Sequence, residues 1–279
     1  MTELLIALAI GAAAGTHIAT WGMYKDSPHE GFTWKTYFRS PIVGAITGVA
    51  VWAVTGIDVY AAGDRVLLYG SAYALERALV EFWKTFIRRE DQSKYFIPGM
   101  FHVFGRVIDK PGERALIGVG VLVFVLLVAG GVYWLETSGP AIHPLIVILI
   151  AGSAGGWISA FGGAWKDAPI EGFETFKFFR SPGLAAFYGF LVSFFTTHYL
   201  FVMLPAIGYT IATIETYKTF FFLSRPRGKF QGIPEHFPQY RTWRFRFLPV
   251  YITIWLLVVV NFVMAFLEPH GGLATQLFR

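Results

Sequence analysis

The stretch KDSPHEGFTWKTYFRSP at residues 25–41 returns in the second half of the chain as KDAPIEGFETFKFFRSP at residues 166–182. Ten of the seventeen aligned positions are identical, whereas ordinary residue frequencies would give about one identity by chance. The same alignment also matches two glycine pairs, which are Gly11 with Gly15 and Gly152 with Gly156. The chain is therefore predicted to contain two copies of one structural unit.

A second block repeats later in each copy. The sequence EFWKTF at residues 81–86 matches ETYKTF at residues 215–220. The boundary between the copies is expected in the connection Glu136–His143, where Gly139-Pro140 is a turn signal. The predicted repeats are residues 1–138 and 139–279, which together form one membrane domain.

The composition places the chain in a membrane. Hydrophobic residues make up 55% and charged residues only 15%, whereas a soluble domain carries about 25% charged residues. Eight stretches approach the roughly 20 apolar residues that a membrane-spanning helix needs. They are Leu4–Tyr24, Pro41–Ala62, Val66–Ile87, Ala115–Leu135, Pro144–Trp165, Pro182–Met203, Ala206–Leu223 and Phe247–Leu267. The third and seventh carry charged residues and could instead lie tilted or at the membrane interface.

The predicted fold is an all-α integral membrane protein with about eight transmembrane helices. Basic residues concentrate in the loops after the first, third, fifth and seventh helices. Positively charged loops remain in the cytoplasm, so both termini are expected on the non-cytoplasmic side. Each repeat has four crossings, an even number, so the two tandem four-helix repeats should be related by a pseudo-twofold axis along the membrane normal.

Capping signals predict several helix ends. Ser40-Pro41, Ser181-Pro182 and Pro144 are typical of helix starts, because proline in the first turn loses no hydrogen bond. Asp64 is expected to cap the third helix. Leu204-Pro205 is expected to connect the sixth and seventh helices.

The repeated block at residues 25–41 is expected to be a cytoplasmic loop with interleaved charges. Carboxylates of Asp26, Glu30, Asp167 and Glu171 suit a hard cation. Basic side chains suit a phosphate group instead; they are Lys25, Arg39, Lys166 and Arg180. A structural clasp of salt bridges explains the same residues, and the sequence leaves all three interpretations open.

The repeated E-x-x-K sequence places an acid and a base on one helical face. Arg77, Glu81, Lys84 and Arg88 form one polar stripe, and Glu215 with Lys218 form its counterpart. A charge at membrane depth is costly and faces a partner or a wet cavity. The residues therefore predict either ion pairs buried between helices or a polar cavity that receives one pair from each repeat. Glu76 and Arg77 align with Thr210 and Ile211, so their charges belong to one repeat only.

The glycine pairs and the histidines favour structural roles. Small residues spaced four apart let membrane helices approach closely, which favours packing over a channel-lining role. His17 and His198 lie in predicted helices, where haem ligation is one interpretation and a hydrogen-bonded packing role is the favoured one. No cysteine is present, which excludes thiolate chemistry, and the residues identify no cofactor or metal.

The favoured function is that of a transporter or channel-like protein with a pseudo-symmetric charged site near the cytoplasmic face. One alternative is an accessory subunit of a larger membrane complex. Another is an enzyme acting on a phosphate-bearing lipid, although the chain has no recognised catalytic motif. Expected partners are the lipid bilayer, anionic lipid headgroups around the aromatic and basic run Tyr240–Phe247, and further copies or chains of a membrane complex. A net charge of +5 is too small to imply nucleic acid.

Overall fold

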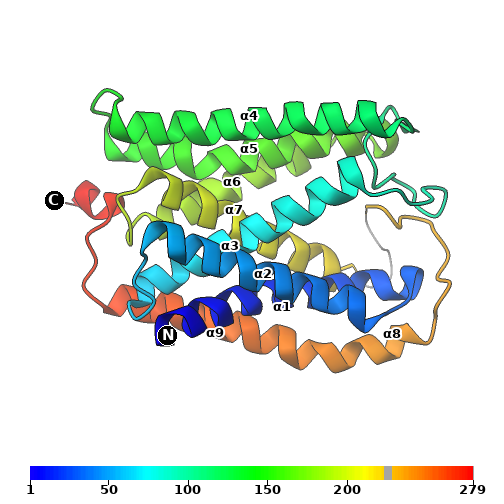
Figure 1. The fold of residues 1–279 in the computed structure, drawn as a ribbon, viewed down its shortest axis with the longest axis horizontal. Coiled ribbons are helices and arrows are strands. Elements are labelled where there is room, and N and C mark those ends of the chain that lie inside the picture. The colour runs from blue at the N-terminus through cyan, green and yellow to red at the C-terminus, as the bar shows by residue number, and fades with distance from the viewer. Residues whose placement is uncertain (223–227, 279) are drawn as a thin grey trace.

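The computed structural model describes residues 1–222 and 228–278 and shows long helices lying side by side (Figure 1). The long helices are α1 (Thr2–Glu30), α2 (Trp34–Thr55), α3 (Ala62–Phe82), α4 (Pro111–Thr137), α5 (Pro144–Glu171), α6 (Thr175–Val192), α7 (Tyr199–Phe220) and α9 (Leu248–Leu267). The short elements are the π-helical turn Trp83–Ile87, strands β1 (His102–Val103) and β2 (Arg106–Val107), α8 (Tyr240–Trp243), and the 3-10 turns Arg244–Phe247 and Leu273–Phe278. β1 and β2 pair antiparallel, with His102 opposite Val107.

Within the described ranges, six helices are long and apolar enough to cross a membrane: α1, α2, α4, α5, α7 and the continuous segment Tyr240–Leu267. The protein is therefore an all-α, polytopic integral membrane protein, as predicted. α3 and α6 do not combine the length and apolar composition of a membrane-spanning helix. α3 carries Glu76, Arg77 and Glu81, and α6 has only 18 residues, among them Lys177 and Arg180.

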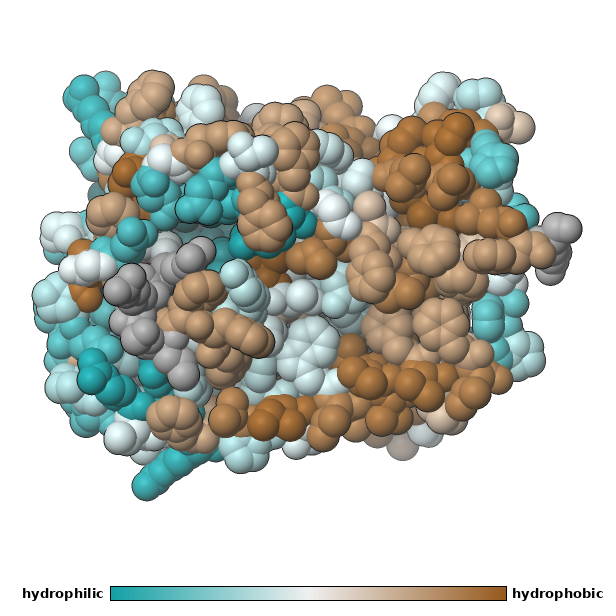
Figure 2. Space-filling view, turned by 180° about the vertical axis from the view of Figure 1, so that it is seen from behind, coloured by the Kyte–Doolittle hydropathy of each residue, from teal (hydrophilic) through white to brown (hydrophobic). Residues whose placement is uncertain are grey.

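The surface agrees with this class. Both termini lie at one end of the helix bundle, and the long loops after α3 and α7 lie at the other (Figure 1). Figure 2 shows hydrophilic side chains gathered toward the loop-bearing end, while most hydrophobic ones lie between the middle and the opposite end. α4 and α9 leave many large apolar side chains exposed, among them Leu126, Leu127 and Leu256, as lipid-facing helices do.

The repeated charged block is mostly helical, which corrects its assignment as a loop. α1 continues through Glu30 and α5 through Glu171, so only residues 31–33 and 172–174 form connections. Gly31 (φ 77°) and Gly172 (φ 90°) make these tight turns, because glycine adopts positive φ without steric penalty.

α2 and α6 begin earlier than predicted. The Thr33 hydroxyl accepts a hydrogen bond from the Thr36 amide and caps α2 at Trp34, which leaves Ser40-Pro41 inside the helix. Ser181-Pro182 lies inside α6 in the same way. A proline inside a helix removes one backbone hydrogen bond, and membrane helices tolerate this loss where neighbouring helices and side chains satisfy the freed group. By contrast, Pro144 begins α5, as predicted.

The predicted start of α7 is wrong. The connection from α6 is residues 193–198, and Pro205 lies within α7. The carboxylate of Glu136, at the end of α4, accepts hydrogen bonds from the Tyr199 amide at 2.7 Å and from His198 Nδ1 at 2.7 Å. This cap comes from a distant part of the sequence, so local signals could not reveal it. The end predicted for this helix at Leu223 lies outside the described residues.

α3 receives an equivalent cap. Its first amide, that of Ala62, donates to the Glu268 carboxylate at 2.8 Å, and Glu268 follows the end of α9. Asp64, the predicted cap, instead accepts from the Asp58 amide at 2.8 Å. The last long helix of each predicted repeat therefore caps the third helix of the other.

Close glycine contacts hold the helix pairs together. A Cβ on Gly11 would lie 2.2 Å from the Gly44 carbonyl oxygen of α2, and one on Gly156 would lie 2.6 Å from the Ser181 oxygen of α6. The two predicted glycine pairs thus pack α1 on α2 and α5 on α6. α3 and α7 meet in the centre, where a Cβ on Gly208 would lie 2.0 Å from the Gly70 oxygen.

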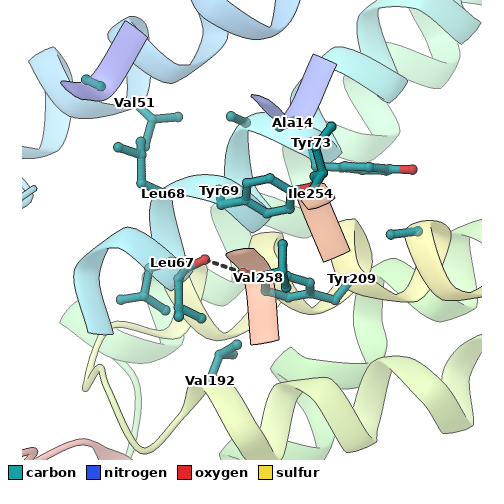
Figure 3. Packing of buried hydrophobic residues seen from close by; sticks show 14 of the residues in the cluster. Ala14, Val51, Leu67, Leu68, Tyr69, Tyr73, Val192, Tyr209, Ile254 and Val258 are labelled. Carbon is teal, nitrogen blue, oxygen red and sulfur yellow. Dashed lines mark hydrogen bonds between the residues drawn. The ribbon is translucent and has the colours of Figure 1, made fainter. Parts of the chain in front are cut away.

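The core lies between the two predicted repeats. Tyr69 and Leu68 of α3 pack with Tyr209 of α7 and Val258 of α9 in one buried cluster (Figure 3). Tyr209 also donates a hydrogen bond to the Val66 carbonyl at 2.8 Å. Because α9 packs on α1 and α3, and α4 packs beside α7, the two halves interlock.

Candidate charged site between the two halves

The polar stripe predicted along α3 is present as a pair of salt bridges. Glu81 Oε1 lies 2.5 Å from Arg77 Nη2 and 3.3 Å from Lys84 Nζ. The helix widens into the π turn Trp83–Ile87 just after Glu81, which rotates the following side chains relative to a regular α-helix. Glu81 thus has one base on each side along the helix.

The counterpart in α7 is tied to the other half. Glu215 lies 3.4 Å from Lys218 Nζ on its own helix and 3.0 Å from Lys25 Nζ of α1. Lys166, which aligns with Lys25, is in turn an electrostatic neighbour of Glu81. Glu215 therefore pairs with a lysine of the opposite repeat, and Glu81 interacts electrostatically with one.

Arg77 connects the two acids. Its guanidinium pairs with Glu81 and also interacts electrostatically with Glu215. Both acids and Arg77 line one cavity of about 510 Å³, which we call the α5–α7 cavity. Apolar residues of α5 and α7 also line this cavity. Its other charged lining residues include Asp167, Lys177, Arg180 and Lys218.

A second cavity of about 390 Å³, the α1–α3 cavity, is also lined by Arg77. Its charged lining includes Asp26, Glu30, Arg39 and Lys84, all named from the sequence. The first copy of the repeated block thus lines one cavity, and the second copy lines the other. Arg77, which only one repeat possesses, lines both.

The acids of the repeated block are paired with lysines. Asp26 and Glu30 lie 3.1 and 2.9 Å from Lys229 Nζ. Asp167 lies 3.5 Å from Lys177 Nζ, which also contacts Glu171. This arrangement matches the salt-bridge clasp more closely than a cation site. Residues 1–222 and 228–278 include no group of three or more histidine or acidic side chains that could hold a metal ion.

Lys229 lines the α1–α3 cavity and pairs there with acids of α1. Burial by itself lowers the pKa of Lys229, but the carboxylates of Asp26 and Glu30 raise it above its usual value. The Lys229 carbonyl also accepts a hydrogen bond from the Phe96 amide at 2.8 Å. The loop after α7 is therefore joined both to α1 and to the loop after α3.

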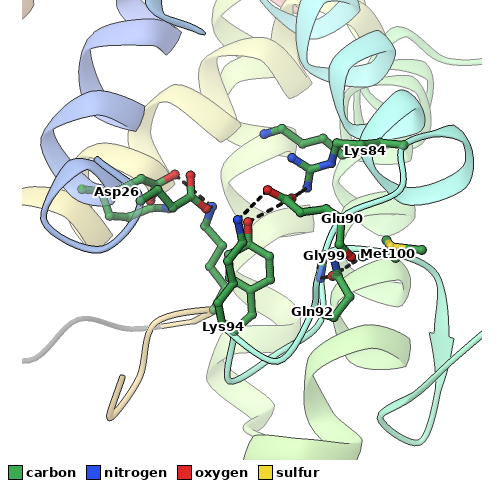
Figure 4. A network of polar contacts seen from close by, with 12 residues as sticks. Asp26, Lys84, Glu90, Gln92, Lys94, Gly99 and Met100 are labelled. Carbon is green, nitrogen blue, oxygen red and sulfur yellow. Dashed lines mark hydrogen bonds and ion pairs between the residues drawn. The ribbon is translucent and has the colours of Figure 1, made fainter. Parts of the chain in front are cut away.

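The loop after α3 adds its own polar network (Figure 4). Glu90 accepts from Lys94 at 2.6 Å and pairs with Arg88 at 2.6 Å. The Gln92 side chain accepts from the amides of Gly99 and Met100 and so fixes the loop. The loop after α3 is thus fixed internally, and its Phe96 amide joins it to the loop after α7 at the Lys229 carbonyl.

Part of the site could not be read from the sequence. The residues that sequence reasoning missed are Lys229, Lys177, Glu90 and Trp83. Arg88, which the sequence placed in the polar stripe, pairs instead with Glu90. Lys229 had a signal, since it aligns with Lys94 in the other repeat. Trp83 is near Arg39, which is distant in the sequence, whereas Glu90 and Lys177 pair with residues that lie nearby in the chain.

Lys25 and Lys166 have a role that the sequence did not indicate. The sequence suggested them as phosphate ligands, yet Lys25 pairs with Glu215 and Lys166 interacts electrostatically with Glu81. Because they come from the repeated block of one half and the acids from the other half, only the packed structure brings them together.

The two histidines predicted in helices lie in separate environments, and only His17 is helical; His198 directly precedes α7. His17 is fully buried, with Nδ1 2.6 Å from the Tyr69 hydroxyl and its ring packed against Tyr251 and Trp255. His198 is exposed and pairs with Glu136. A packing role accounts for His17, whereas His198 takes part in the cap that Glu136 provides to α7.

No family model matches the chain, and neither curated proteins nor solved structures match it. The class that the fold defines is a polytopic α-helical membrane protein with paired charged cavities. Any more specific function depends on the site itself.

Proposed function

We propose that the protein is a membrane transporter or channel-like protein with a pseudo-symmetric charged site near its cytoplasmic face. One observation carries this proposal: Glu81 and Glu215, at matching positions of the two repeats, line the same cavity and face the same arginine. The volume of about 510 Å³ falls within the roughly 300–1,000 Å³ of small-molecule sites. Parallel repeats that share a site between them are one transporter arrangement.

Eight crossings and a pseudo-twofold axis along the membrane normal form part of the proposal. Reciprocal caps from Glu136 and Glu268 support the axis, as do the reciprocal lysines Lys25 and Lys166. The common end of both termini (Figure 1) supports an even number of crossings. The basic loops lie at the opposite end, which we assign to the cytoplasm because positive loops are retained there.

The site residues have distinct proposed roles. Glu81 and Glu215 supply negative charge to the α5–α7 cavity, and Arg77, Lys84 and Lys218 either balance that charge or hold an anionic group. Apolar residues of α5 and α7 fill most of the remaining lining, and this low-dielectric lining strengthens every charge interaction in the cavity. The repeated block lines or gates the inner mouth with Asp26, Glu30 and Arg39 in one copy and Asp167, Glu171 and Arg180 in the other.

Flux across proteoliposomes tests the proposal. Purified protein would be reconstituted and charge movement recorded on a solid-supported membrane under separate gradients of H⁺, Na⁺, K⁺ and inorganic phosphate. Glu81→Gln should lower the flux at least about tenfold, since a charge-assisted hydrogen bond contributes roughly 1.5–3 kcal/mol. Glu113→Gln, an exposed acid at the start of α4, is the matched control and should keep the wild-type flux.

Two outcomes would contradict the proposal. Wild-type flux in a folded Glu81→Gln variant would remove Glu81 from the transport site. No flux of any ion in the wild type, together with stable co-purification of other chains, would favour the role of an accessory subunit.

A further inference from the structure

The α1–α3 cavity has an excess of positive charge. Six basic side chains line it: Arg39, Arg77, Lys84, Arg88, Lys94 and Lys229. Three acidic side chains, Asp26, Glu30 and Glu90, line it as well. The α5–α7 cavity differs, because four bases and four acids line it. Only the α1–α3 cavity would therefore attract an anion in preference to a cation.

The ion pairs within the cavity do not neutralise all of this positive charge. Asp26 and Glu30 both pair with Lys229, and Glu90 pairs with Arg88 and Lys94. Arg77 and Lys84 share Glu81, which lines the other cavity. Among the described residues, Arg39 makes no salt bridge; Glu76 and Glu81 act on it only at longer range.

Three hydrogen-bond donors in the cavity lining have no partner. They are the Nε groups of Arg39 and Arg88 and the hydroxyl of Ser27, each shielded from solvent in the described structure. Ser27 as a whole is only 2% exposed. A buried donor without an acceptor costs about 1–3 kcal/mol, so three of them around one cavity favour the entry of an acceptor. In the part of the chain that the structure describes, the one carboxylate oxygen without a partner in the same lining, Asp26 Oδ1, makes no hydrogen bond to them.

Both arginines lie beside Trp83, and Arg88 acts electrostatically on Arg39. The guanidinium of Arg39 lies 5.8 Å and that of Arg88 5.7 Å from the centre of the Trp83 ring. An indole ring attracts a cation at this distance. Two guanidiniums held at one ring repel each other, and an oxyanion between them would remove the repulsion and accept from both. Guanidiniums suit this role, because their forked N–H groups match the oxygens of phosphate.

We propose that the α1–α3 cavity binds a phosphate-bearing anion, with Arg39 and Arg88 as guanidinium donors and Ser27 as a hydroxyl donor. Such a group can belong to a soluble phosphate or to the headgroup of an anionic lipid. The inference deepens the proposed function by naming a ligand class, and it rests on that function only for carriage across the membrane. Binding itself is measured without flux, so the two proposals can fail separately.

Binding of two probes tests the site. Full-length protein in phosphatidylcholine nanodiscs at low salt would be titrated with ³²P-labelled inorganic phosphate, and in a parallel series phosphatidic acid would be added to the nanodiscs while thermal unfolding is followed. Wild-type protein should bind at least one probe, and binding should weaken as salt screens the charges. Saturable binding of inorganic phosphate identifies a soluble ligand. Stabilisation by phosphatidic acid alone identifies a lipid headgroup.

Arg39→Gln and Arg88→Gln should each weaken binding at least about tenfold, which equals the loss of about 1.4 kcal/mol. Arg89→Gln is the matched control, since it removes the same charge from the exposed neighbour of Arg88 and should bind as the wild type does. Arg39→Lys, which keeps the charge and loses the forked geometry, should bind with intermediate affinity and serves if Arg39→Gln does not fold. Equal binding in Arg39→Gln and Arg89→Gln, or no binding of either probe by the wild type, would overturn the proposal.

Discussion

The two cavities begin from the same repeated residues and end with different chemistry. Each contains an acid and an arginine of the repeated block, Asp26 and Arg39 in one and Asp167 and Arg180 in the other. The α1–α3 cavity adds basic loop residues and is positively charged. The α5–α7 cavity is balanced in charge and lined largely by apolar side chains. Residues that are identical in the two repeats thus line both cavities. Residues that differ between the repeats account for the difference in charge between the cavities.

Arg77 is the clearest unmatched residue. Its counterpart Ile211 lines the α5–α7 cavity without a charge, whereas Arg77 lines both cavities. Because the Arg77 guanidinium lines both cavities, a ligand bound in one cavity changes the electrostatic environment of the other. The α1–α3 cavity is further altered by Lys229, which comes from the loop of the second half.

The largest expected difference between the halves lies in helix packing. Gly11→Ala places a Cβ 2.2 Å from the Gly44 oxygen, whereas Gly152→Ala places it 3.0 Å from the Gly189 Cα. Overpacking typically costs about 1–3 kcal/mol, so Gly11→Ala should lie near the upper limit and Gly152→Ala near the lower one. Thermal unfolding in detergent measures both. Gly22→Ala, with no atom within 4 Å of its new Cβ, is the control; equal effects at positions 11 and 152 would make the two helix pairs equivalent.

Removing Arg77 should have the next largest effect. Arg77→Gln leaves Glu81 and Glu215 without their shared cation, and breaking a buried ion pair costs about 3–5 kcal/mol. The cost here should be smaller, about 2 kcal/mol, because Glu81 is partly exposed to the cavity and solvent screens the pair. Restoration of the wild-type unfolding temperature in Arg77→Gln with Glu81→Gln would show that the unpaired acid caused the loss. No change in the single variant would remove Arg77 from the centre of the site.

The reciprocal caps should behave alike. Glu136→Gln and Glu268→Gln each weaken a carboxylate cap at a helix N-terminus, where negative charge and an acceptor together contribute about 1 kcal/mol. Both variants should therefore lose a similar, modest amount of unfolding free energy in thermal or denaturant unfolding. A loss confined to one of them would count against the proposed axis that relates the halves.

The smallest effect concerns acid stability of the loop over the α1–α3 cavity. Burial by itself raises the pKa of Glu90, but the hydrogen bond from Lys94 and the charge of Arg88 lower it overall. A lowered pKa gives stability above the ordinary carboxyl pKa, and this stability is lost as the pH falls through the lower value of the folded state. Glu90→Gln should therefore lose less stability than the wild type between about pH 5 and pH 3. Identical acid profiles in thermal unfolding would contradict the assignment.

The membrane class and the matching positions of Glu81 and Glu215 could be predicted from two kinds of signal, apolar length and internal repetition. Both signals can be read along a single chain without knowledge of tertiary contacts. The ends of helices were less predictable. Ser40-Pro41 has the features of a helix start, but Thr33 supplies an earlier cap. Pro205 has the features of a break, but α7 begins before it because Glu136 caps Tyr199.

The partners of the site could not be predicted for the same reason. Lys229 reaches Asp26 from the opposite half of the sequence, and Trp83 holds arginines from two different segments. Spacing rules predict contacts between neighbours along one helix and do not predict contacts between distant segments of the chain. The excess charge of the α1–α3 cavity could be counted only after the loops were placed.

The exchange of caps between the halves has a consequence for biosynthesis. α3 leaves the ribosome long before Glu268 exists, so the amide of Ala62 must wait for the last part of the chain to be inserted. The N-terminal half is then an incomplete product during translation, open to quality-control proteases until synthesis ends. Two separately expressed fragments, cut in the connection after α4, should be degraded alone and should accumulate together as a stable complex.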